Sequence, residues 1–578
     1  MQTRKLAVIV AFAATLAVAP AASGQAEPTF TFYGSGFGHG IGMSQWGAYG
    51  LAQQGWTHER ILTHYYTGTT LGKAGHEPAR IRVGLVDGAQ SVHLAARGGP
   101  VTLHADAPNG STVATIPSGS TYQMKTGTGG YVVVDGSGKQ VAATTASSTL
   151  YATYQEANGM LRSAEAGHTY NRGVIEFNDA ASCSGCAPEL RMIAVLTPQQ
   201  YLYGLGEVPS SWPMEAMEAQ ADAARTYAEY LIGALGQARA GCNCGVYDDT
   251  RNQVYAGWDH EGENGGEQWV QAVNATAGEV VLYQGKLIDA QYTSSSGGFT
   301  ENNENVWGGT PIPYLRGVCD PGDYTSANPA ATWKVSLAAS AVTTKLRPYT
   351  GNIGTVTGFG SVQRGVSGRI RTAKVTGTGG SKTVAGSTLR SALGLMDDRI
   401  WINTNKNVTG AIRVKYDALD CAPGLPTSAE LPLSGGSVQR FEDGAIYRNT
   451  GAGRTTWLTG EVYAKYVQLD EARGVLGLPR SNVGILTAPA GCDRSQCRKA
   501  SFDNGVIFFR TETGAHELHG AVLSYLQAQG GVSGRLGFPT TDVTAQQNGQ
   551  TEATFQGRGS PIVVSCSADG ACSDSSGS

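Results

Sequence analysis

The chain has 578 residues and therefore has room for several domains. Charged residues make up only 15% of it, and its 80 glycines are about twice the usual share, which favours many strands and turns over long charged helices. A net charge of −4 provides no basic surface for nucleic acid or for anionic lipid. The sequence therefore predicts neither of these partners.

Residues 1–26 have the pattern of a secretory signal peptide. Arg4 and Lys5 precede an apolar run, and small residues follow at 22–26. The run is short for a membrane span, and no later stretch is long and apolar enough to be one. We therefore expect an exported protein with no membrane segment after the signal peptide is removed.

Ten cysteines in an exported chain indicate disulfide bonds. Three pairs are close in sequence, and a fourth would form over a longer span: Cys183–Cys186, Cys492–Cys497, Cys566–Cys572 and Cys319–Cys421. Cys242 and Cys244 are only two positions apart, which would strain a direct bridge between them. The sequence leaves the partners of these two cysteines open.

Five glycines between residues 34 and 42 surround His39 near the start of the expected mature chain. Such a density of glycine lets the backbone approach a ligand or another strand closely. A lone histidine in a turn has an equally good structural explanation, and the segment has too few ligands for a zinc site. Short helices are expected over residues 43–52 and around residues 61–66.

The next part of the chain is predicted to be rich in strands. Residues 79–86 alternate between apolar and polar side chains, and the section from about 87 to 160 contains several short alternating runs. Further strands are expected at 172–177 and 190–196. No chemical motif falls in this part, so its expected role is structural.

A helix is expected from Pro213, which has no amide hydrogen bond to lose in a first turn, to a stop at Gly233. Its apolar residues recur at spacings of three and four, and half of them are alanine: Met214, Met217, Ala221, Ala224, Ala228 and Leu231. Small side chains let this helix lie close to its neighbours. The expected fold is α+β and β-rich, with a mixed sheet core and this central helix.

Glu207 precedes the central helix on a constrained turn, between a Gly-Leu-Gly run and Val208-Pro209. A carboxylate beside apolar and aromatic neighbours such as Val208 and Trp212 would have a raised pKa and could remain protonated as a general acid. The structural alternative is that Glu207 only caps a helix or forms a salt bridge.

Three motifs carry a family resemblance. The pattern E-x-P-x-x-W-P-x-E-A from Glu207 onward, with Gln220 and Arg225-Thr226-Tyr227, resembles the signature of the stage II sporulation protein D family of peptidoglycan-cleaving proteins. GHGIGMSQWGA at 38–48 resembles a second signature, which usually ends the family domain, so the order here resembles a circular permutation. S-x-S-G-G-x-T-E at 294–301 resembles the third.

The resemblance covers residues 27–404, including the β-rich section at about 87–160. One departure is Glu218, where the family usually carries lysine. Some relatives bind zinc after the central helix, so a site formed by Cys242, Cys244 and His260 is an alternative. A disulfide or free thiols are favoured over it, and we expect no metal and no cofactor.

From about residue 410 the sequence contains repeated motifs, which indicate a repeat module. VLGLP at 475–479 and RLGFP at 535–539 lie 60 residues apart, and RFEDGAIYR at 440–448 is echoed at 501–510 and near 554. Self-similarity of this kind indicates stacked units. The pattern resembles LGFP repeats, which are cell-wall-associated modules, over residues 410–565. Two full copies are expected with partial ones at each end, followed by a tail at 566–578.

The resemblance implies a secreted, wall-associated lytic transglycosylase that cleaves between N-acetylmuramic acid and N-acetylglucosamine. Glu207 would act as general acid and then as base, and one carboxylate would suffice because the substrate supplies the nucleophile, whereas a hydrolase uses a pair. The implied substrate-binding residues are His39, Ser44, Gln45, Gln220, Arg225, Tyr227, Ser294, Ser296, Thr300 and Glu301.

The alternative function is a wall-binding protein without catalysis. Relatives described as amidase enhancers carry the same domain, so such a protein would activate a partner amidase. In both cases the expected partners are peptidoglycan glycan strands and, through the repeats, a cell-wall polymer.

Overall fold

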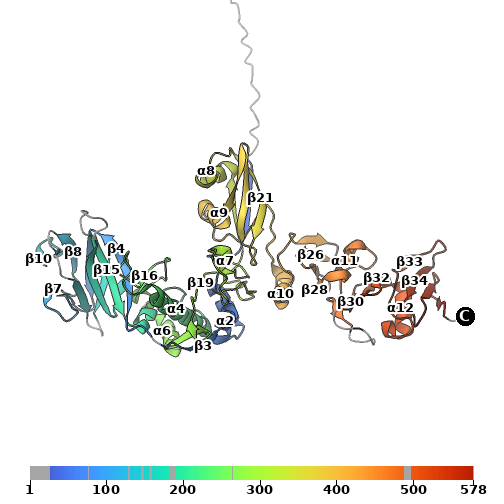
Figure 1. Cartoon of the computed structure of the whole chain (residues 1–578), viewed down its shortest axis with the longest axis horizontal. Helices are drawn as coiled ribbons and strands as arrows, with labels where there is room; N and C mark the ends of the chain where they lie inside the picture. The colour runs from blue at the N-terminus through green and yellow to red at the C-terminus, as the bar shows by residue number, and fades with distance from the viewer. Residues whose placement is uncertain are drawn as a thin grey trace, which may run out of the picture.

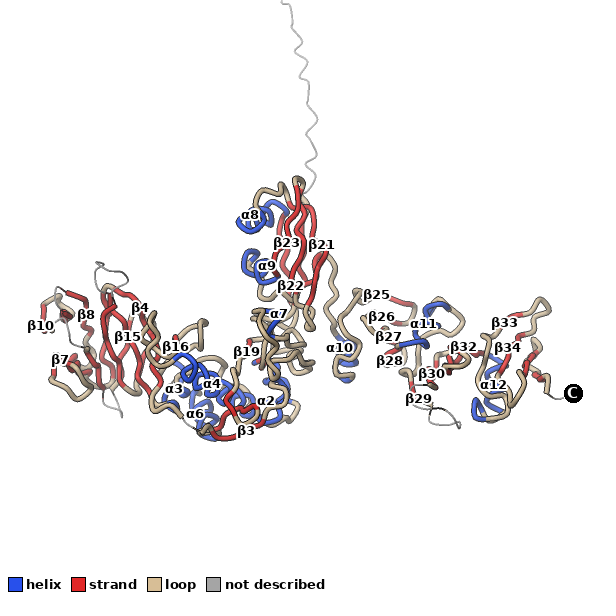
Figure 2. Tube along the Cα trace, viewed as in Figure 1, coloured by secondary structure: helices blue, strands red, loops and turns tan. Residues whose placement is uncertain are grey.

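The computed structural model describes residues 27–576, except for 76, 128–129, 145–148, 155–158, 181–188, 263–264, 487–491 and 493–495. The predicted signal peptide at 1–26 and the expected Cys183–Cys186 pair lie outside the described residues. The chain forms a strand-rich lobe, a helical centre, an α/β unit and a row of repeat units (Figures 1 and 2). The predicted α+β, β-rich fold is confirmed.

The strand-rich lobe contains a seven-stranded sheet in the order β16-β4-β15-β14-β11-β6-β7 and a six-stranded sheet in the order β10-β9-β8-β5-β12-β13. β16 pairs with β4 in parallel, so the larger sheet is mixed. The strands are β4 (Ile81–Ala89), β5 (Ser91–Arg97), β6 (Val101–Ala105), β7 (Thr112–Ile116), β8 (Thr121–Gly127), β9 (Gly130–Val134), β10 (Gln140–Ala143), β11 (Leu150–Tyr154), β12 (Met160–Ser163), β13 (Thr169–Tyr170), β14 (Val174–Ala180), β15 (Glu189–Leu196) and β16 (Val246–Tyr247). The predicted β-rich section at 87–160 is therefore one part of a larger lobe, which also includes β4, β14, β15 and β16.

The helical centre is organised around α4 (Met214–Leu235), which is buried along most of its length. The expected stop at Gly233 is wrong, because the helix continues for two more residues to Leu235 and the chain leaves it at Gly236, whose φ of 79° a helix does not allow. The other elements are α1 (Gln45–Gln53), α2 (His58–Tyr65), α3 (Pro198–Tyr203), α5 (Trp258–Glu261), α6 (Gly266–Ala275), α7 (Asn303–Val306), β2 (Met43–Ser44), β3 (Thr70–Lys73), β17 (Glu279–Tyr283), β18 (Lys286–Leu287) and β19 (Tyr292–Thr293). Among the helices of the described residues, none is long and apolar enough to cross a membrane.

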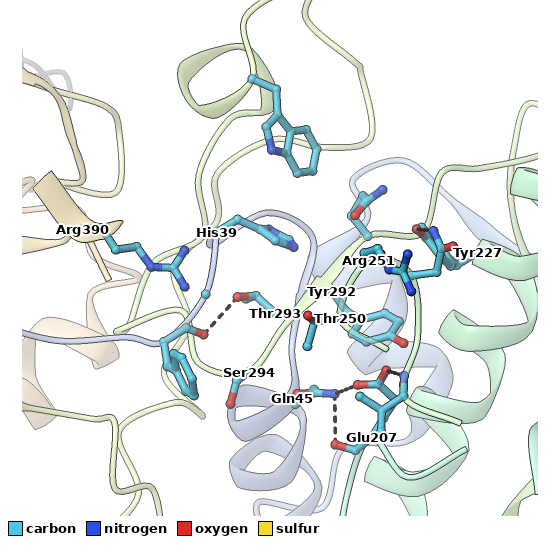
Figure 3. Close-up of a pocket in the computed structure, with 16 residues that line it drawn as sticks. His39, Gln45, Glu207, Tyr227, Thr250, Arg251, Tyr292, Thr293, Ser294 and Arg390 are labelled. Carbon is cyan, nitrogen blue, oxygen red and sulfur yellow. Dashed lines mark hydrogen bonds between the residues drawn. The ribbon is translucent and has the colours of Figure 1, made fainter. Parts of the chain in front are cut away.

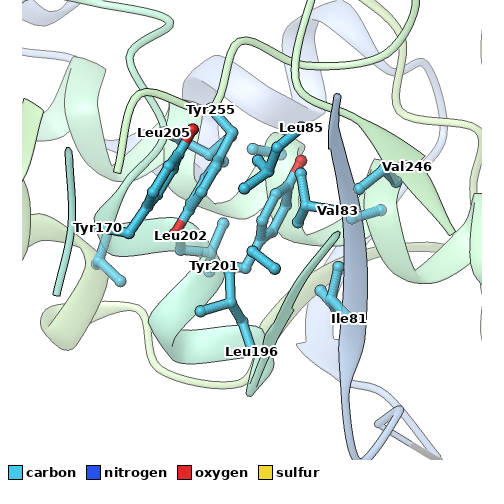
Figure 4. Close-up of a cluster of buried hydrophobic side chains, with 14 of the residues drawn as sticks. Ile81, Val83, Leu85, Tyr170, Leu196, Tyr201, Leu202, Leu205, Val246 and Tyr255 are labelled. Carbon is cyan, nitrogen blue, oxygen red and sulfur yellow. The ribbon is translucent and has the colours of Figure 1, made fainter. Parts of the chain in front are cut away.

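One hydrophobic core joins the strand-rich lobe to the helical centre. Val83 of β4 and Leu196 of β15 pack toward α3 and the turn that follows it (Figure 4). The ring of Tyr201 stacks on that of Tyr255, with 5.6 Å between the ring centroids. This packing fixes the segment that leads to Glu207.

The α/β unit has its own core and includes the first described strand. β1 pairs with β20 along its whole length and with β24, so residues 29–34 lie beside residues 333–338. The elements are β1 (Thr29–Gly34), β20 (Trp333–Ala338), α8 (Ala339–Thr350), β21 (Val356–Arg364), β22 (Ile370–Gly377), β23 (Gly380–Ala385), α9 (Gly386–Leu393) and β24 (Ile400–Ile402). The two ends of the predicted 27–404 domain are thus adjacent.

The repeat module consists of three units, each with a helix followed by a four-stranded antiparallel sheet. In all three units a proline pairs with a phenylalanine: Pro426 with Phe441, Pro479 with Phe502, and Pro539 with Phe555. The elements are α10 (Gly410–Ala418), β25 (Leu431–Leu433), β26 (Gly436–Arg440), β27 (Ala445–Asn449), β28 (Arg454–Leu458), α11 (Gly460–Gln468), η1 (Glu471–Arg473), β29 (Gly484–Ile485), β30 (Cys497–Ser501), β31 (Gly505–Arg510), β32 (Gly514–His519), α12 (Gly520–Ala528), η2 (Gly531–Ser533), β33 (Thr544–Ala545), β34 (Thr551–Phe555), β35 (Ile562–Cys566) and β36 (Cys572–Asp574).

This module differs from the sequence expectation in two places. The expected partial copies at its ends belong to complete helix–sheet units, because α10 and the last sheet supply the missing parts. The expected tail at 566–578 begins inside the last sheet. β36 pairs with β35 there, and Asp574 accepts a hydrogen bond from Nη1 of Arg535 at 3.0 Å.

The disulfides that the sequence predicts within the described residues are confirmed: Cys319–Cys421, Cys492–Cys497 and Cys566–Cys572. Cys242 and Cys244, whose partners the sequence leaves open, are bonded to each other. Their thiols are therefore not available as zinc ligands, which argues against the alternative site with His260.

Candidate active site

A cleft of about 570 Å³ lies between the N-terminal glycine-rich segment, the Glu207 turn and β19 (Figure 3). His39 and Gln45 line it from the first segment, and Tyr292 lines it from β19. Arg390 of α9 reaches the same space, so the α/β unit contributes to its wall. Residues from widely separated parts of the sequence therefore meet at one site.

The turn that presents Glu207 is held by residues 254–257. Leu205 pairs with Tyr255, and the amide of Gly206 donates to the carbonyl of Val254 at 2.9 Å. A side chain at Gly204 would place its Cβ 2.5 Å from the Tyr255 ring, so only glycine fits this close approach. The turn is thus fixed by the packing on both sides of Glu207.

The Glu207 carboxylate accepts hydrogen bonds from protein groups on both oxygens. The amide of Val254 donates to Oε1 at 2.7 Å, and Nε2 of Gln45 lies 3.4 Å from Oε2. Burial raises the pKa of Glu207, while hydrogen bonds from Val254, Tyr292 and Gln45 oppose that shift. The net shift is upward, so the acid form persists to higher pH than in an ordinary glutamate.

The sequence names Val208 and Trp212 as apolar and aromatic neighbours of Glu207. Trp212 packs on the Trp46 ring, with 4.8 Å between the centroids. The groups that hydrogen-bond to the carboxylate are Gln45, Val254 and Tyr292, and these bonds lower its pKa, whereas burial raises it. The upward direction of the net shift agrees with the expectation.

An indole and an imidazole border the cleft across from Glu207. The rings of Trp307 and His39 have centroids 5.2 Å apart, and Trp307 is 52% exposed. Burial, with help from Arg369 and Arg390, lowers the pKa of His39 to about 4, so that its imidazole is neutral at neutral pH. A neutral ring beside an exposed aromatic face suits an uncharged ligand such as a sugar.

Five of the residues predicted to act at the site line the cleft: His39, Gln45, Glu207, Tyr227 and Ser294. The hydroxyl of Tyr227 accepts a hydrogen bond from Nδ2 of Asn252 at 3.1 Å, and burial raises its pKa. These residues are positioned to contact a ligand, and their binding roles stay predictions.

Ser44 and Ser296 lie behind the cleft in a buried polar network. Asp320 and Asp323 of this network are fully buried, and burial raises the pKa of each carboxyl group. The hydroxyl of Ser44 donates to Asp323 at 2.8 Å, and that of Ser296 donates to Asp320 at 2.6 Å. Ser44 also caps α1 by accepting a hydrogen bond from the amide of Gly47. Their contacts are structural ones within the protein.

Thr300 and Glu301 are buried and bond to other parts of the chain. Thr300 accepts a hydrogen bond from the amide of Val318 at 2.8 Å. Glu301 accepts from the hydroxyl of Ser367 at 2.6 Å and from the amide of Val366 at 3.1 Å. Glu301 therefore ties the third motif to the α/β unit that carries Arg390.

Gln220 and Arg225 are the remaining predicted residues, and both are buried in α4. Oε1 of Gln220 accepts from Nε2 of Gln45 at 3.3 Å, which helps to orient Gln45 toward Glu207. Nη1 of Arg225 donates to Asp222 at 2.7 Å and to the carbonyl of Glu279 at 2.7 Å. Neither residue lines the cleft.

The sequence motifs miss several residues that line the cleft. Tyr292 comes two positions before the third motif, and its aromatic character was the available signal. Thr250, Arg251 and Asn252 lie on a loop without a motif. Arg390 belongs to a separate unit, so its placement depends on tertiary packing alone.

Glu207 supplies the only carboxylate among the described residues that line this cleft. It also borders a second hollow of about 380 Å³, where Asp259 is a further carboxylate. Asp259 is paired with His168 at 3.1 Å and with Arg162 at 3.6 Å. The free carboxylate chemistry of the cleft therefore rests on Glu207.

Comparison with known families agrees with the motifs. Residues 187–283 match the SpoIID family, described as stage II sporulation protein, and residues 424–474 and 485–534 match the LGFP repeat. The chain thus contains a SpoIID domain, which holds Glu207 and α4, and LGFP repeats. The N-terminal signature lies outside the matched span, so the permuted order stays a prediction.

Two known proteins are similar to about a quarter of this chain. An amidase enhancer of Bacillus subtilis (strain 168) is 36% identical over 139 residues, which is 24% of this chain and 17% of the relative. A stage II sporulation protein D of Bacillus amyloliquefaciens is 34% identical over 148 residues, which is 24% of this chain and 43% of the relative. The chain spans less than half the length of each of these relatives.

Proposed function

We propose that this chain is a cell-wall-remodelling protein, and specifically a lytic transglycosylase that cleaves peptidoglycan glycan strands. The observation that carries the proposal is Glu207, whose pKa is raised by burial and which is the only carboxylate among the described cleft-lining residues. The SpoIID match and the name of the first relative, amidase enhancer, support a role in cell-wall remodelling.

The chemistry requires one carboxyl group that acts twice. Protonated Glu207 donates its proton to the glycosidic oxygen, and the bond from that oxygen to the muramic anomeric carbon breaks. The resulting carboxylate then takes the proton of the muramic C6 hydroxyl, whose oxygen bonds to the anomeric carbon and closes a 1,6-anhydro ring. A hydrolase would need a second carboxylate at a set separation to activate water.

Other cleft residues would orient the Glu207 carboxylate and bind the substrate. The Val254 amide and Gln45 hold the carboxylate in one orientation, which favours productive proton transfer. Trp307 offers an exposed face for a sugar ring. The guanidinium groups of Arg251 and Arg390 suit the carboxylates that peptidoglycan carries.

The test uses the exported chain and its Glu207→Gln variant, incubated with purified peptidoglycan that is either intact or stripped of stem peptides. Mass spectrometry of the soluble products is expected to show anhydro-muramyl ends from the wild type, with the variant slower by roughly 10²–10⁴-fold. Reducing ends would indicate a hydrolase instead. Absence of products from a wild type that still pellets with the wall would overturn the enzymatic proposal.

A second candidate is a non-catalytic wall protein that activates a partner amidase. The name of the first relative, amidase enhancer, favours it, as does the 2.7 Å hydrogen bond by which Val254 supports the ionised form of Glu207. In this case amidase activity on whole walls would rise equally with the wild type and with Glu207→Gln. We further propose that the LGFP repeats hold the exported protein at a cell-wall polymer.

A further inference from the structure

A histidine and four carboxylates gather where α2, α4 and β17 meet, and none of them lines the cleft. His58 is the first residue of α2, and Glu279 is the first residue of β17. Glu215, Glu218 and Asp222 follow one face of α4 at spacings of three and four. These elements are far apart in sequence, so the fold alone brings the five side chains together.

The carboxylates outnumber the hydrogen-bond donors that face them. Nδ1 of His58 lies 2.9 Å from Oε2 of Glu215 and 3.1 Å from Oε2 of Glu218. One ring nitrogen carries at most one proton, so it can donate fully to only one of these oxygens. The amide of His58 also donates to Glu215, at 2.6 Å. Two carboxylates therefore converge on one imidazole.

Asp222 provides the second and independent observation. Its side chain is 0% exposed, and Oδ1 accepts a hydrogen bond from Arg225 at 2.7 Å. Oδ2 is also buried, yet it has no hydrogen-bond partner among the residues that the structure describes. A buried carboxylate oxygen without a partner is costly, and a bound cation is one way to satisfy it.

We propose that His58, Asp222 and Glu279 bind a divalent transition-metal ion of the Zn²⁺ or Mn²⁺ class. One ligand atom from each of these residues lies within 4.8 Å of the other two. A nitrogen donor combined with carboxylate oxygens fits these ions, whereas Ca²⁺ is bound by oxygen ligands alone. Glu215 and Glu218 add negative charge beside the imidazole.

The positively charged side chains near the site do not neutralise all of its carboxylates. Arg225 binds one oxygen of Asp222 and the backbone carbonyl of Glu279. Lys73 lies opposite Glu279 in the strand pairing, and its amine donates to the carbonyl of Ala277. These two cations do not balance four carboxylates.

The bound ion would join α2, α4 and β17 at one point. α4 begins directly after the turn that carries Glu207, so the ion would stabilise the support of that turn without taking part in proton transfer. The sequence predicts no metal, because these ligands come from three separate elements and form no motif. The proposal holds whether or not the chain cleaves glycan.

The experiment uses the full exported chain after dialysis against a chelator. Zn²⁺, Mn²⁺ and Ca²⁺ are each titrated alone by calorimetry, and the thermal midpoint is measured with and without each metal. The variants are His58→Ala and Glu279→Gln, which alter partly exposed residues, and the control is Glu267→Gln, an exposed acid in the first turn of α6.

We expect one Zn²⁺ or Mn²⁺ ion per chain and a rise in the thermal midpoint of roughly 5–10 °C at a hundred times the Kd. Each site variant is expected to weaken binding at least roughly tenfold and to reduce the metal-dependent rise, while the control keeps both. Because the rise is compared within each variant, a general loss of stability does not imitate this result. No binding of either metal, a response to Ca²⁺ alone, or undiminished binding by both variants would overturn the proposal.

Discussion

Two cores of the repeat module are each shared by units that follow one another in the chain, whereas the cleft takes its walls from segments that lie far apart in the chain. In the repeats, a helix and the four strands beside it come from one continuous stretch. In the cleft, His39, Glu207 and Arg390 meet only in the folded protein. The difference indicates that a change in one repeat reaches the adjoining unit, while changes near the cleft reach several distant segments at once.

The polar groups of the two regions differ in the same way. Behind the cleft, Asp320 and Asp323 are fully buried and accept hydrogen bonds from Ser44, Ser295 and Ser296. In the repeats, the feature that all three units share is instead a proline–phenylalanine pair. The buried network holds one wall of the cleft in place, and the proline–phenylalanine pairs hold the strands of each repeat unit together.

The strongest test of this contrast is Phe502→Ala in the second repeat. Phe502 is buried against Tyr466, with 4.6 Å between the ring centroids, so its removal should cost roughly 3–5 kcal/mol of unfolding free energy. Pelleting with purified walls is expected to fall while cleavage of soluble glycan fragments is kept. Val467→Ala, at a residue 44% exposed, is the control. Equal loss of both activities would contradict the separation of the two regions.

The disulfide Cys319–Cys421 connects the two regions, since Cys319 follows the third motif and Cys421 follows α10. It spans 102 residues, so replacing both cysteines with serine should lower the unfolding free energy by roughly 2–5 kcal/mol in denaturant titrations. The matched control is the Cys566–Cys572 pair, which spans only 6 residues and should cost less. A larger loss from the short bridge would contradict the expectation that the bridge between the two regions stabilises the protein more.

A smaller effect is expected from Trp307→Ala at the rim of the cleft. Trp307 is half exposed and faces His39, so its removal should weaken glycan binding by roughly 0.5–1.5 kcal/mol and raise KM with little change in kcat. Trp307→Phe keeps an aromatic face and should restore most of the affinity. If phenylalanine and alanine gave the same KM as the wild type, the indole would have no part in binding.

The sequence predicts the repeats and the Glu207 turn well, because both depend on local patterns. The 60-residue spacing of the Leu-Gly motifs indicates the units, and Glu207 stands between a Gly-Leu-Gly run and Val208-Pro209, which predicts a turn. The family resemblance assigns Ser44, Ser296 and Glu301 to substrate binding, yet in the structure these side chains form hydrogen bonds inside the protein. Polar residues in a motif serve a buried scaffold or a ligand equally well, and only the tertiary contacts distinguish the two.

The dependence on tertiary contacts also explains which site residues the sequence does not predict. Tyr292 and Arg390 reach the cleft from a strand and a helix without motifs, and the His58 cluster joins three elements. The Cys242–Cys244 bridge is also left open by sequence spacing. The cleft residues and the His58 cluster depend on how separate elements pack, whereas the Cys242–Cys244 bridge depends on the local conformation of one loop, in which Asn243 has a φ of 53°.

The measurement that tests the central claim most directly is the pH dependence of single-turnover cleavage of soluble glycan strands. Glu207 is the proposed acid, and its pKa is raised above its ordinary value of 4.5, so the rate should hold below the raised pKa and fall as pH rises through it. The pKa of His39 is lowered to about 4, so His39 titrates at lower pH than Glu207. Glu207→Gln should leave only a slow rate without this decline. A rate that increases toward alkaline pH, or a variant with the wild-type profile, would contradict the assignment of Glu207.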